Sequence, residues 1–263
     1  IHLLQPQSNI QLSRRNPEAF LQAACRVIRR GYGYPAVFNA DAVVQELVGM
    51  GKSLEDARGG GTSGCVETGC FGKEAYVLTG YLNTPKVLEL ALNDGVDPRT
   101  GTRIGPATGD PRSFGSFEDL IGAFRAQLHH VVDIKLRGNA VMERLYARYA
   151  PAPFLSVLIE DCIARGRDYN DGGARYNTTY IQCVGIGTIT DGLSALKTHV
   201  FDDRSVAMGD LLAALADDFS GREPLRQKLS NATPRYGNDD DRADGIMRRV
   251  FDLLLQEIDG KPN

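Results

Sequence analysis

Residues 59–70, with the sequence GGGTSGCVETGC, place a thiol and a carboxylate in a segment with few other side chains. Cys65 and Glu67 are two positions apart, and in an extended backbone such residues point to the same side. This arrangement presents a sulfur and a carboxylate to one small ligand, with Val66 turned away. The glycines cost conformational entropy on folding, which is easier to understand when a loop must approach something closely. The alternative, a buried cysteine with Glu67 in solvent, stays open at this point.

Two glycine-containing segments resemble nucleotide-binding motifs but fail on spacing. Residues 49–53, GMGKS, lack the earlier glycine of a phosphate loop, and Gly51 is better interpreted as the C-terminal cap of a helix. Residues 185–192, GIGTITDG, lack the third glycine of a dinucleotide fingerprint. A strand leading into a helix capped by Thr190 or Asp191 explains that segment without a ligand.

The sequence also gives little support for a bound metal. Cys65 and Cys70 lack the paired short spacings of a zinc site, and the adjacent His129 and His130 point about 100° apart on a helix. Residues 236–244, YGNDDDRAD, lack the glycine and terminal glutamate of a calcium loop. Acidic residues favoured at a helix N-terminus explain that run, so we expect no metal site.

Composition is ordinary for a soluble globular protein. The 263 residues are 42% hydrophobic and 24% charged, with a net charge of −3 that predicts no nucleic-acid or membrane partner. No stretch reaches the roughly 18 apolar residues of a membrane span, and the N-terminus lacks the pattern of a signal peptide. It also lacks an initial Met, and we expect a piece of a longer, cytoplasmic protein. An odd number of cysteines favours a reducing compartment: Cys25, Cys65, Cys70, Cys162 and Cys183.

Helical periodicity is clear near the N-terminus. Asn16 is expected to cap a helix with Pro17 at its first position, ending at Gly31. Phe20, Ala24, Val27 and Ile28 share one stripe of that helix, so Cys25 beside them is expected to be a core residue.

Helices and short strands alternate along the rest of the chain. Extended segments are expected at 74–83 and 174–190, where β-branched and aromatic residues gather. Helices are expected at 40–50 after Asn39, 53–57, 84–92, 117–149 after Ser116, and 156–166, followed by three more, of which the last is 241–258. This order predicts an α/β architecture with a largely parallel sheet or barrel.

Four segments in this order strongly resemble the glycyl radical enzymes, the family of pyruvate formate-lyase and its dehydratase and decarboxylase relatives. They are LEDARGGGTSGCVE, which runs into SGCVETG, then GGARYN, and RYGNDDDRAD. The resemblance implies an α/β barrel of about ten strands flanked by helices. It identifies Cys65 as the thiyl-forming cysteine that abstracts hydrogen from the substrate. It identifies Glu67 as the general base of the members that are not formate-lyases.

The resemblance also implies what lies outside residues 1–263. We expect these residues to be the central part of one barrel domain, without its N-terminal part and without the domain that carries the radical glycine. No bound cofactor is expected. The glycyl radical would be installed by an activating enzyme that uses S-adenosylmethionine and an iron–sulfur cluster. The complete protein is expected to be a homodimer of anaerobic metabolism, and this chain alone is expected to be inactive.

Departures from the family pattern bear on the reaction. Gly64 precedes Cys65 where pyruvate formate-lyase has a second cysteine, which disfavours formate C-acetyltransferase activity. Thr68 follows Glu67 where diol and choline eliminases usually have proline. Residues 74–83 follow the catalytic loop, and we expect Thr79 and Tyr81 to contact the substrate. The prediction is a radical C–O or C–X lyase of a small hydroxylated substrate. An arylacetate decarboxylase of the hydroxyphenylacetate type is the nearest alternative, and an inactive remnant is the non-enzymatic one.

Overall fold

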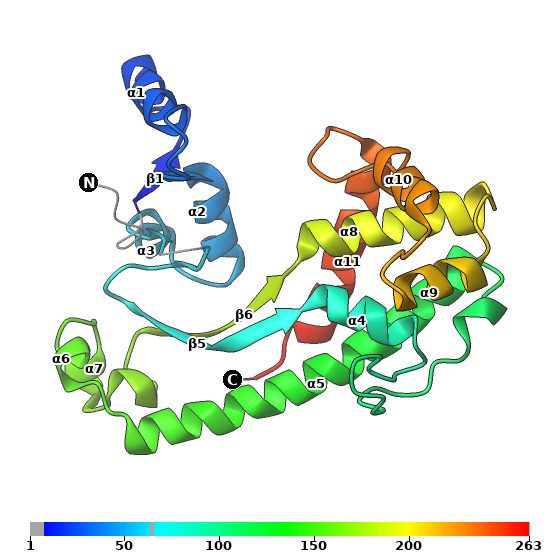
Figure 1. Ribbon diagram of the computed structural model, residues 1–263. Coiled ribbons are helices and arrows are strands. Elements are labelled where there is room, and N and C mark those ends of the chain that lie inside the picture. The colour runs from blue at the N-terminus through cyan, green and yellow to red at the C-terminus, as the bar shows by residue number, and fades with distance from the viewer. Residues whose placement is uncertain (1–7, 64–65, 263) are drawn as a thin grey trace. The chain divides into compact units, whose positions relative to one another are not determined.

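The computed structural model describes residues 8–63 and 66–262, which form a mixed α/β structure (Figure 1). The chain divides into two compact units. The first contains residues 1–79 and 140–180, and the second contains residues 80–139 and 181–263. Each unit is described by itself below.

The first unit begins with two short parallel strands. β1 (Asn9–Leu12) pairs with β2 (Ala36–Asn39) in register from Asn9 opposite Ala36, and α1 (Glu18–Ile28) connects them. Two helices follow directly, α2 (Ala40–Gly49) and α3 (Leu54–Arg58).

The caps of α2 and α3 follow the sequence. Asn39 Oδ1 accepts hydrogen bonds from the backbone N–H groups of Asp41 and Ala42, which caps α2. Gly51 has a φ of +83°, and the next residue, Lys52, donates its N–H to the carbonyl of Leu47. This left-handed glycine ends α2 as the sequence predicts, and no phosphate loop forms. Ser53 accepts from the N–H of Asp56 and caps α3.

The remaining sheets are a small hairpin and a pair of longer strands, and these longer strands extend from the first unit into the second. β3 (Gly61–Thr62) pairs antiparallel with β4 (Thr68–Gly69), and β5 (Glu74–Asn83) pairs with β6 (Tyr176–Val184). The expected extended segment at 74–83 is confirmed. The described residues contain three two-stranded sheets rather than a ten-stranded barrel, so the α/β class holds and a closed barrel is not observed.

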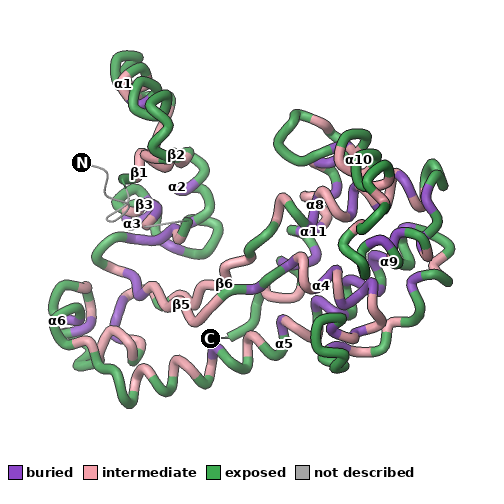
Figure 2. Tube along the Cα trace, in the orientation of Figure 1, coloured by how far each residue is buried: buried purple, intermediate pink, exposed green. Residues whose placement is uncertain are grey.

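The second unit is mainly helical. Its helices are α4 (Thr84–Ala91), the first part of α5 (Phe117–Tyr149), α8 (Ile186–Ala195), α9 (Met208–Ala216), α10 (Glu223–Asn231) and α11 (Asp241–Ile258). A π-helical segment, Leu196–Asp202, extends α8. Figure 2 shows buried residues gathered where α4, α5, α8 and α9 meet. This core contains fully buried Phe124, Leu128, Ile189 and Leu193.

The long helix α5 has the ends that its sequence predicts. Ser116 Oγ accepts from the N–H of Asp119, and the Asp119 carboxylate accepts from the N–H of Ser116. This reciprocal pair is a capping box with Asp in place of Glu. The helix then runs to Tyr149, just before the first proline of PAP. α11 also has its predicted bounds, and the carboxylate of Asp240 caps it.

Two predictions for the first helix are wrong. Asn16 does not cap α1, because its Oδ1 accepts from the N–H of Ser13 at 2.6 Å and closes the preceding turn. Cys25 is exposed rather than in the core. Of the stripe beside it, only Ala24 is buried, while the other three apolar residues are 39–45% exposed. Periodicity identifies an apolar face but not what covers it.

Residues 156–166 do not form one helix. They hold the end of α6 (Pro153–Ser156) and all of α7 (Cys162–Arg165), separated by turns, with Asp161 at a φ of +75°.

The helix α8 does not begin at Thr190 or Asp191, as the sequence predicted. It begins at Ile186, after Gly185 adopts a φ of +84°, and the Thr190 hydroxyl donates to the carbonyl of Ile186 inside the helix. No helix within the described residues is long and apolar enough to cross a membrane.

Candidate active site

The predicted catalytic segment forms the β3–β4 hairpin and its tip. Thr62 pairs with Thr68, and the N–H of Ser63 donates to the carbonyl of Glu67 at 2.8 Å. The half-buried Glu67 carboxylate accepts from Ser63 Oγ at 3.2 Å and from the N–H of Val66 at 3.3 Å. Cys65 lies outside the described residues, so its predicted role stays a prediction. Glu67 therefore stands at the tip of a short hairpin that the sequence did not reveal.

The glycines of this hairpin permit close packing. A Cβ atom on Gly69 would lie 2.7 Å from Glu74 Oε2 and closer still to the hydroxyl of Tyr76. A Cβ on Gly61 would lie 2.8 Å from the ring of Phe71. Only glycine fits at these two positions, because such distances are shorter than any real Cβ contact.

A buried ion pair lies directly behind Gly69. Lys52 Nζ is 2.5 and 2.7 Å from the two carboxylate oxygens of Glu74, and these residues are 6% and 0% exposed. The Glu74 carboxylate also accepts from the N–H of Cys70 at 2.7 Å and from the hydroxyl of Thr178. With these donors the carboxylate is well satisfied, although Glu74 is completely buried. Sequence reasoning missed this pair, although a lysine just after a helix end and an acid opening an apolar strand were visible signals.

Two stacked tyrosines also lie against β4. The rings of Tyr76 and Tyr180 are 5.6 Å apart and nearly parallel, at 6°. The Tyr180 hydroxyl donates to the carbonyl of Thr68, while the buried Tyr76 hydroxyl has no hydrogen-bond partner within residues 8–63 and 66–262. Burial raises the pKa of both phenols, so both stay neutral. The Thr68 hydroxyl donates to Glu46 Oε1 at 2.8 Å.

Asp56 joins two of the segments that carry the family resemblance. Its carboxylate accepts from Lys73, from the Tyr176 hydroxyl at 2.8 Å and from Arg175 at 3.4 Å. The Lys73 hydrogen bond is the main reason why the pKa of Asp56 lies well below its usual range. Arg175 also binds Glu160 at 2.7 Å. LEDARGGG and GGARYN are therefore in direct contact through side chains 119 and 120 residues apart.

The cysteines of the described residues fit packing roles in most cases. Cys70 and Cys162 are buried, and burial raises the pKa of both thiols, which keeps them protonated. Cys70 packs with Val43 and Leu47, as the sequence suggested for that residue. The described residues contain no cluster of metal-binding side chains, and His129 and His130 have separate partners, Glu257 and the carbonyl of Ile104.

The two predicted substrate-binding residues lie on β5. Thr79 is half-buried and belongs to the first unit, with Glu67. Tyr81 belongs to the second unit, where it is 62% exposed and lines a pocket of about 290 Å³. The other walls of that pocket are mostly apolar, with Val87, Val131 and Ile134, and with Lys135 at its edge.

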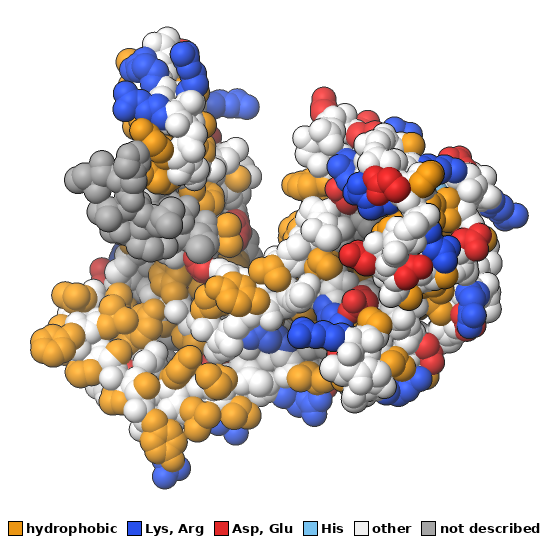
Figure 3. Space-filling model, in the orientation of Figure 1, with side chains coloured by type: hydrophobic (Ala, Val, Ile, Leu, Met, Phe, Trp, Pro, Cys, Tyr) orange, Lys and Arg blue, Asp and Glu red, His pale blue; other side chains and the backbone are white. Residues whose placement is uncertain are grey.

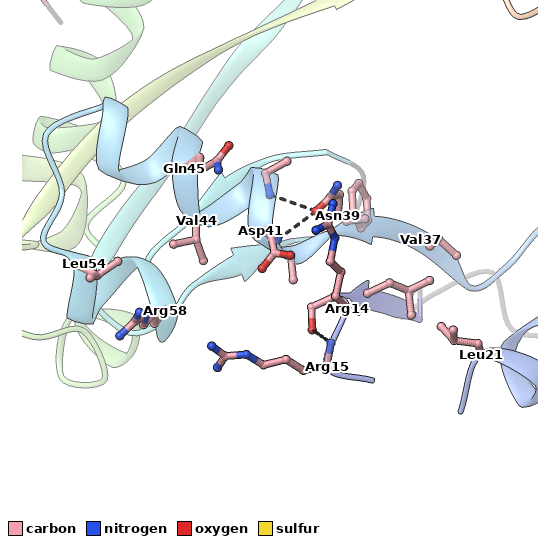
Figure 4. Close-up of a pocket in the computed structure, with 15 residues that line it drawn as sticks. Arg14, Arg15, Leu21, Val37, Asn39, Asp41, Val44, Gln45, Leu54 and Arg58 are labelled. Carbon is pink, nitrogen blue, oxygen red and sulfur yellow. Dashed lines mark hydrogen bonds between the residues drawn. The ribbon is translucent and has the colours of Figure 1, made fainter. Parts of the chain in front are cut away.

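A separate open pocket of about 1200 Å³ lies in the first unit, beside β2 and the start of α2 (Figure 4). Its lining is mostly apolar, and its charged side chains are Arg14, Arg15, Arg58 and Asp41. Its Asn39 side chain is already engaged as the cap of α2, and none of the predicted site residues lines it. This pocket is therefore distinct from the Glu67 hairpin.

Comparison with known protein families identifies the class of protein. The family model described as "Pyruvate formate lyase-like" matches residues 1–263, and the chain belongs to that family.

Within this family, the chain is similar to several characterised dehydratases. The chain is 56% identical to trans-4-hydroxy-L-proline dehydratase of Clostridioides difficile, over 99% of this chain and 33% of that protein. A crystal structure of hydroxyproline dehydratase from the same organism, with trans-4-hydroxy-L-proline bound, matches with a TM-score of 0.94 over 99% of this chain and 33% of that one. The glycerol-bound form of the B12-independent glycerol dehydratase from Clostridium butyricum matches with a TM-score of 0.91 and 33% identity, over 100% of this chain and 33% of that one. The chain thus spans about a third of the length of these relatives.

Proposed function

We propose that the protein to which these residues belong is a glycyl radical dehydratase that eliminates water from a small hydroxylated substrate. The observation that carries this proposal is the 56% identity to a hydroxyproline dehydratase across nearly the whole chain, within a family match that covers every residue. We place hydroxylated proline first among the candidate substrates. Diols such as glycerol come second, because the matched glycerol dehydratase is less similar.

The roles of the residues follow from the chemistry of the proposed reaction. The glycyl radical, on a glycine outside these residues, supplies a thiyl radical at Cys65 when an activating enzyme has installed it. Cys65 then takes a hydrogen atom from a substrate carbon, and Glu67 takes a proton from the substrate as general base. Its side chain is half-buried rather than completely buried, which supports this role. Thr79 and Tyr81 are proposed to contact the substrate.

The wider architecture belongs to the same proposal. Residues 1–263 would form the central part of a ten-stranded barrel domain of the family type, in which β5 and β6 are two of the strands. The complete protein would act as a homodimer with a radical-SAM activating enzyme as its partner, in the cytoplasm. The assignment of residues 1–263 to part of such a domain is supported by the TM-score of 0.94 to a longer relative.

The test uses the full-length protein, activated without oxygen by its radical-SAM enzyme. We expect an electron paramagnetic resonance signal from the glycyl radical and turnover of trans-4-hydroxy-L-proline. Cys65→Ala and Glu67→Gln should each abolish turnover while the glycyl radical still forms. Turnover of 4-hydroxyphenylacetate alone would instead favour the decarboxylase. Failure to form any radical would favour an inactive remnant, and turnover that survives Cys65→Ala would contradict the mechanism.

A further inference from the structure

The strand that follows Glu67 is held by three different elements of the first unit. The Thr68 hydroxyl donates to Glu46 of α2, and the Thr68 carbonyl accepts from Tyr180 of β6. Two residues further on, the N–H of Cys70 donates to Glu74 of β5 at 2.7 Å. Gly69, between them, allows the strand to lie against Glu74 at a distance that no other residue permits. We call these contacts the β4 anchor.

Glu74, which belongs to the β4 anchor, forms an ion pair with Lys52, and burying these two charges costs free energy. Lys52 and Glu74 are almost completely removed from solvent, and the attraction between two such charges often only offsets their desolvation. An apolar pair of similar volume can be as stable or more stable. A contribution to the stability of the fold therefore explains the presence of this ion pair poorly. What the Glu74 carboxylate provides, and an apolar side chain cannot, is an acceptor that fixes the N–H of Cys70.

Thr68 provides the second fixed point. It is 7% exposed, and its bond to Glu46 is a hydrogen bond to a carboxylate, which is stronger than a bond between neutral groups. Its carbonyl is held by the phenol of Tyr180, whose burial keeps it protonated and able to donate. Glu67 is the next residue along the chain, and its own carbonyl closes the hairpin tip by accepting from the N–H of Ser63. The backbone that follows Glu67 is thus held at the carbonyl of Glu67 and at both the hydroxyl and the carbonyl of Thr68.

We propose that Thr68 and Glu74 are positioning residues for Glu67. Thr68 acts through Glu46 and Tyr180, and Glu74 acts through Lys52 and the backbone of Cys70. The inference rests on the proposed role of Glu67 as general base. Because a proton is transferred over a hydrogen-bond distance, a displacement of about 1 Å can slow such a step by up to about a hundredfold.

The first experiment changes Thr68 in the full-length, activated protein. Thr68→Val keeps the shape and removes the hydroxyl, while Thr68→Ser keeps the hydroxyl. With trans-4-hydroxy-L-proline as substrate, we expect Thr68→Val to lower kcat by about 10- to 100-fold, with KM within about twofold and an unchanged glycyl radical signal. Thr68→Ser should retain most of the activity. A Thr68→Val protein with wild-type kcat would overturn the proposal.

The second experiment separates position from stability. Lys52→Met combined with Glu74→Leu replaces the ion pair by apolar side chains, and we expect a similar Tm with a lowered kcat. A double variant with the wild-type Tm and the wild-type kcat would mean that the pair only stabilises the fold. That result would overturn the role of Glu74. The control is Arg226→Met with Glu223→Leu, which removes an exposed ion pair on α10 and should leave kcat unchanged. Should the Lys52 and Glu74 double variant fail to fold, the Thr68 pair of variants decides alone.

Hydrogen exchange distinguishes failure of this inference from failure of the proposed function. In Thr68→Val and in the double variant, the amides of residues 66–73 should exchange faster than in the wild type, whatever the substrate. A wild-type protein that forms its radical but turns over no substrate would contradict the proposed function. The exchange rates would then still show whether the β4 anchor holds the backbone beside Glu67. Unchanged exchange in both variants would overturn the anchor itself.

Discussion

Two glutamates seven positions apart illustrate how surroundings assign roles to identical side chains. Glu67 is half-buried at a hairpin tip, and it accepts from Ser63 and from its neighbour's N–H group. Glu74 is fully buried and accepts from a lysine, a backbone N–H and a threonine hydroxyl. Glu74 is 0% exposed, so a substrate cannot reach its carboxylate, whereas the half-buried Glu67 is partly accessible from solvent. The geometry therefore supports Glu67, not Glu74, as the candidate base.

A buried histidine gives a prediction on pH. His199 is 2% exposed in the π-helical segment, and its Nε2 lies 3.1 Å from Thr233 Oγ1. The Thr233 hydroxyl donates to the carbonyl of Leu229, so it accepts from the histidine and leaves Nδ1 as a bare acceptor. Within the described residues Nδ1 is buried without a partner. Burial lowers the pKa of His199, nearby Lys228 lowers it further, and Asp203 opposes them.

Because the folded state binds this proton less readily than the unfolded state, stability decreases as the pH falls below the ordinary histidine pKa of about 6.5. The loss is complete below the lowered pKa of the folded state. We expect the Tm of the full-length protein to fall between about pH 8 and about pH 5.5, and His199→Gln to reduce that fall. His130→Gln, at a half-exposed position, is the control and should keep the wild-type dependence. Equal pH dependence in wild type and His199→Gln would contradict the assignment.

At the scale of elements, local caps made most helices predictable. Asn39 and Ser116 begin α2 and α5 where the sequence indicates, because a side chain that caps a helix acts over two or three residues. The β3–β4 hairpin was not predictable, since its paired stretches are two residues each and its contacts come from residues up to 112 positions away. The prediction that Thr190 caps a helix was wrong for a related reason. Its hydroxyl can cap a helix or bond back to a carbonyl one turn earlier, and the conformation of Gly185 decides which.

The hairpin gives a prediction on packing. Gly69→Ala adds a methyl group against Glu74 Oε2 and the Tyr76 hydroxyl, both held within a packed interior. We expect this variant of the full-length protein to lose about 1–3 kcal/mol in its free energy of unfolding. Gly49→Ala is the matched control, because a Cβ there meets nothing within 4 Å at the end of α2. It should be neutral or stabilising by up to about 1 kcal/mol. Denaturant unfolding measures both, and equal stability of the two variants would contradict the packing argument.

At the scale of the whole molecule, many large apolar side chains of the described residues are exposed. Figure 3 shows them gathered over α6 and α7. This surface, which we call the α6–α7 patch, contains Tyr149, Phe154, Leu155, Val157, Leu158 and Ile163, from 40% to 89% exposed. The chain spans about a third of the length of its relatives, and in the longer protein proposed above further chain would cover this patch. The sequence supplied the apolar residues but could not tell which of them lack a covering partner within residues 1–263.

The α6–α7 patch predicts how residues 1–263 behave when they are produced alone. Phe154 is 89% exposed and Leu158 is 74% exposed, and large exposed apolar surfaces drive association. We expect the isolated chain to self-associate, as measured by light scattering, and Phe154→Glu with Leu158→Glu to reduce that association. Val48→Glu with Met50→Glu adds the same charge at exposed apolar positions outside the patch and should help less. A monodisperse wild-type chain that melts cooperatively would contradict this expectation, because it would show that the patch is tolerated without further chain to cover it.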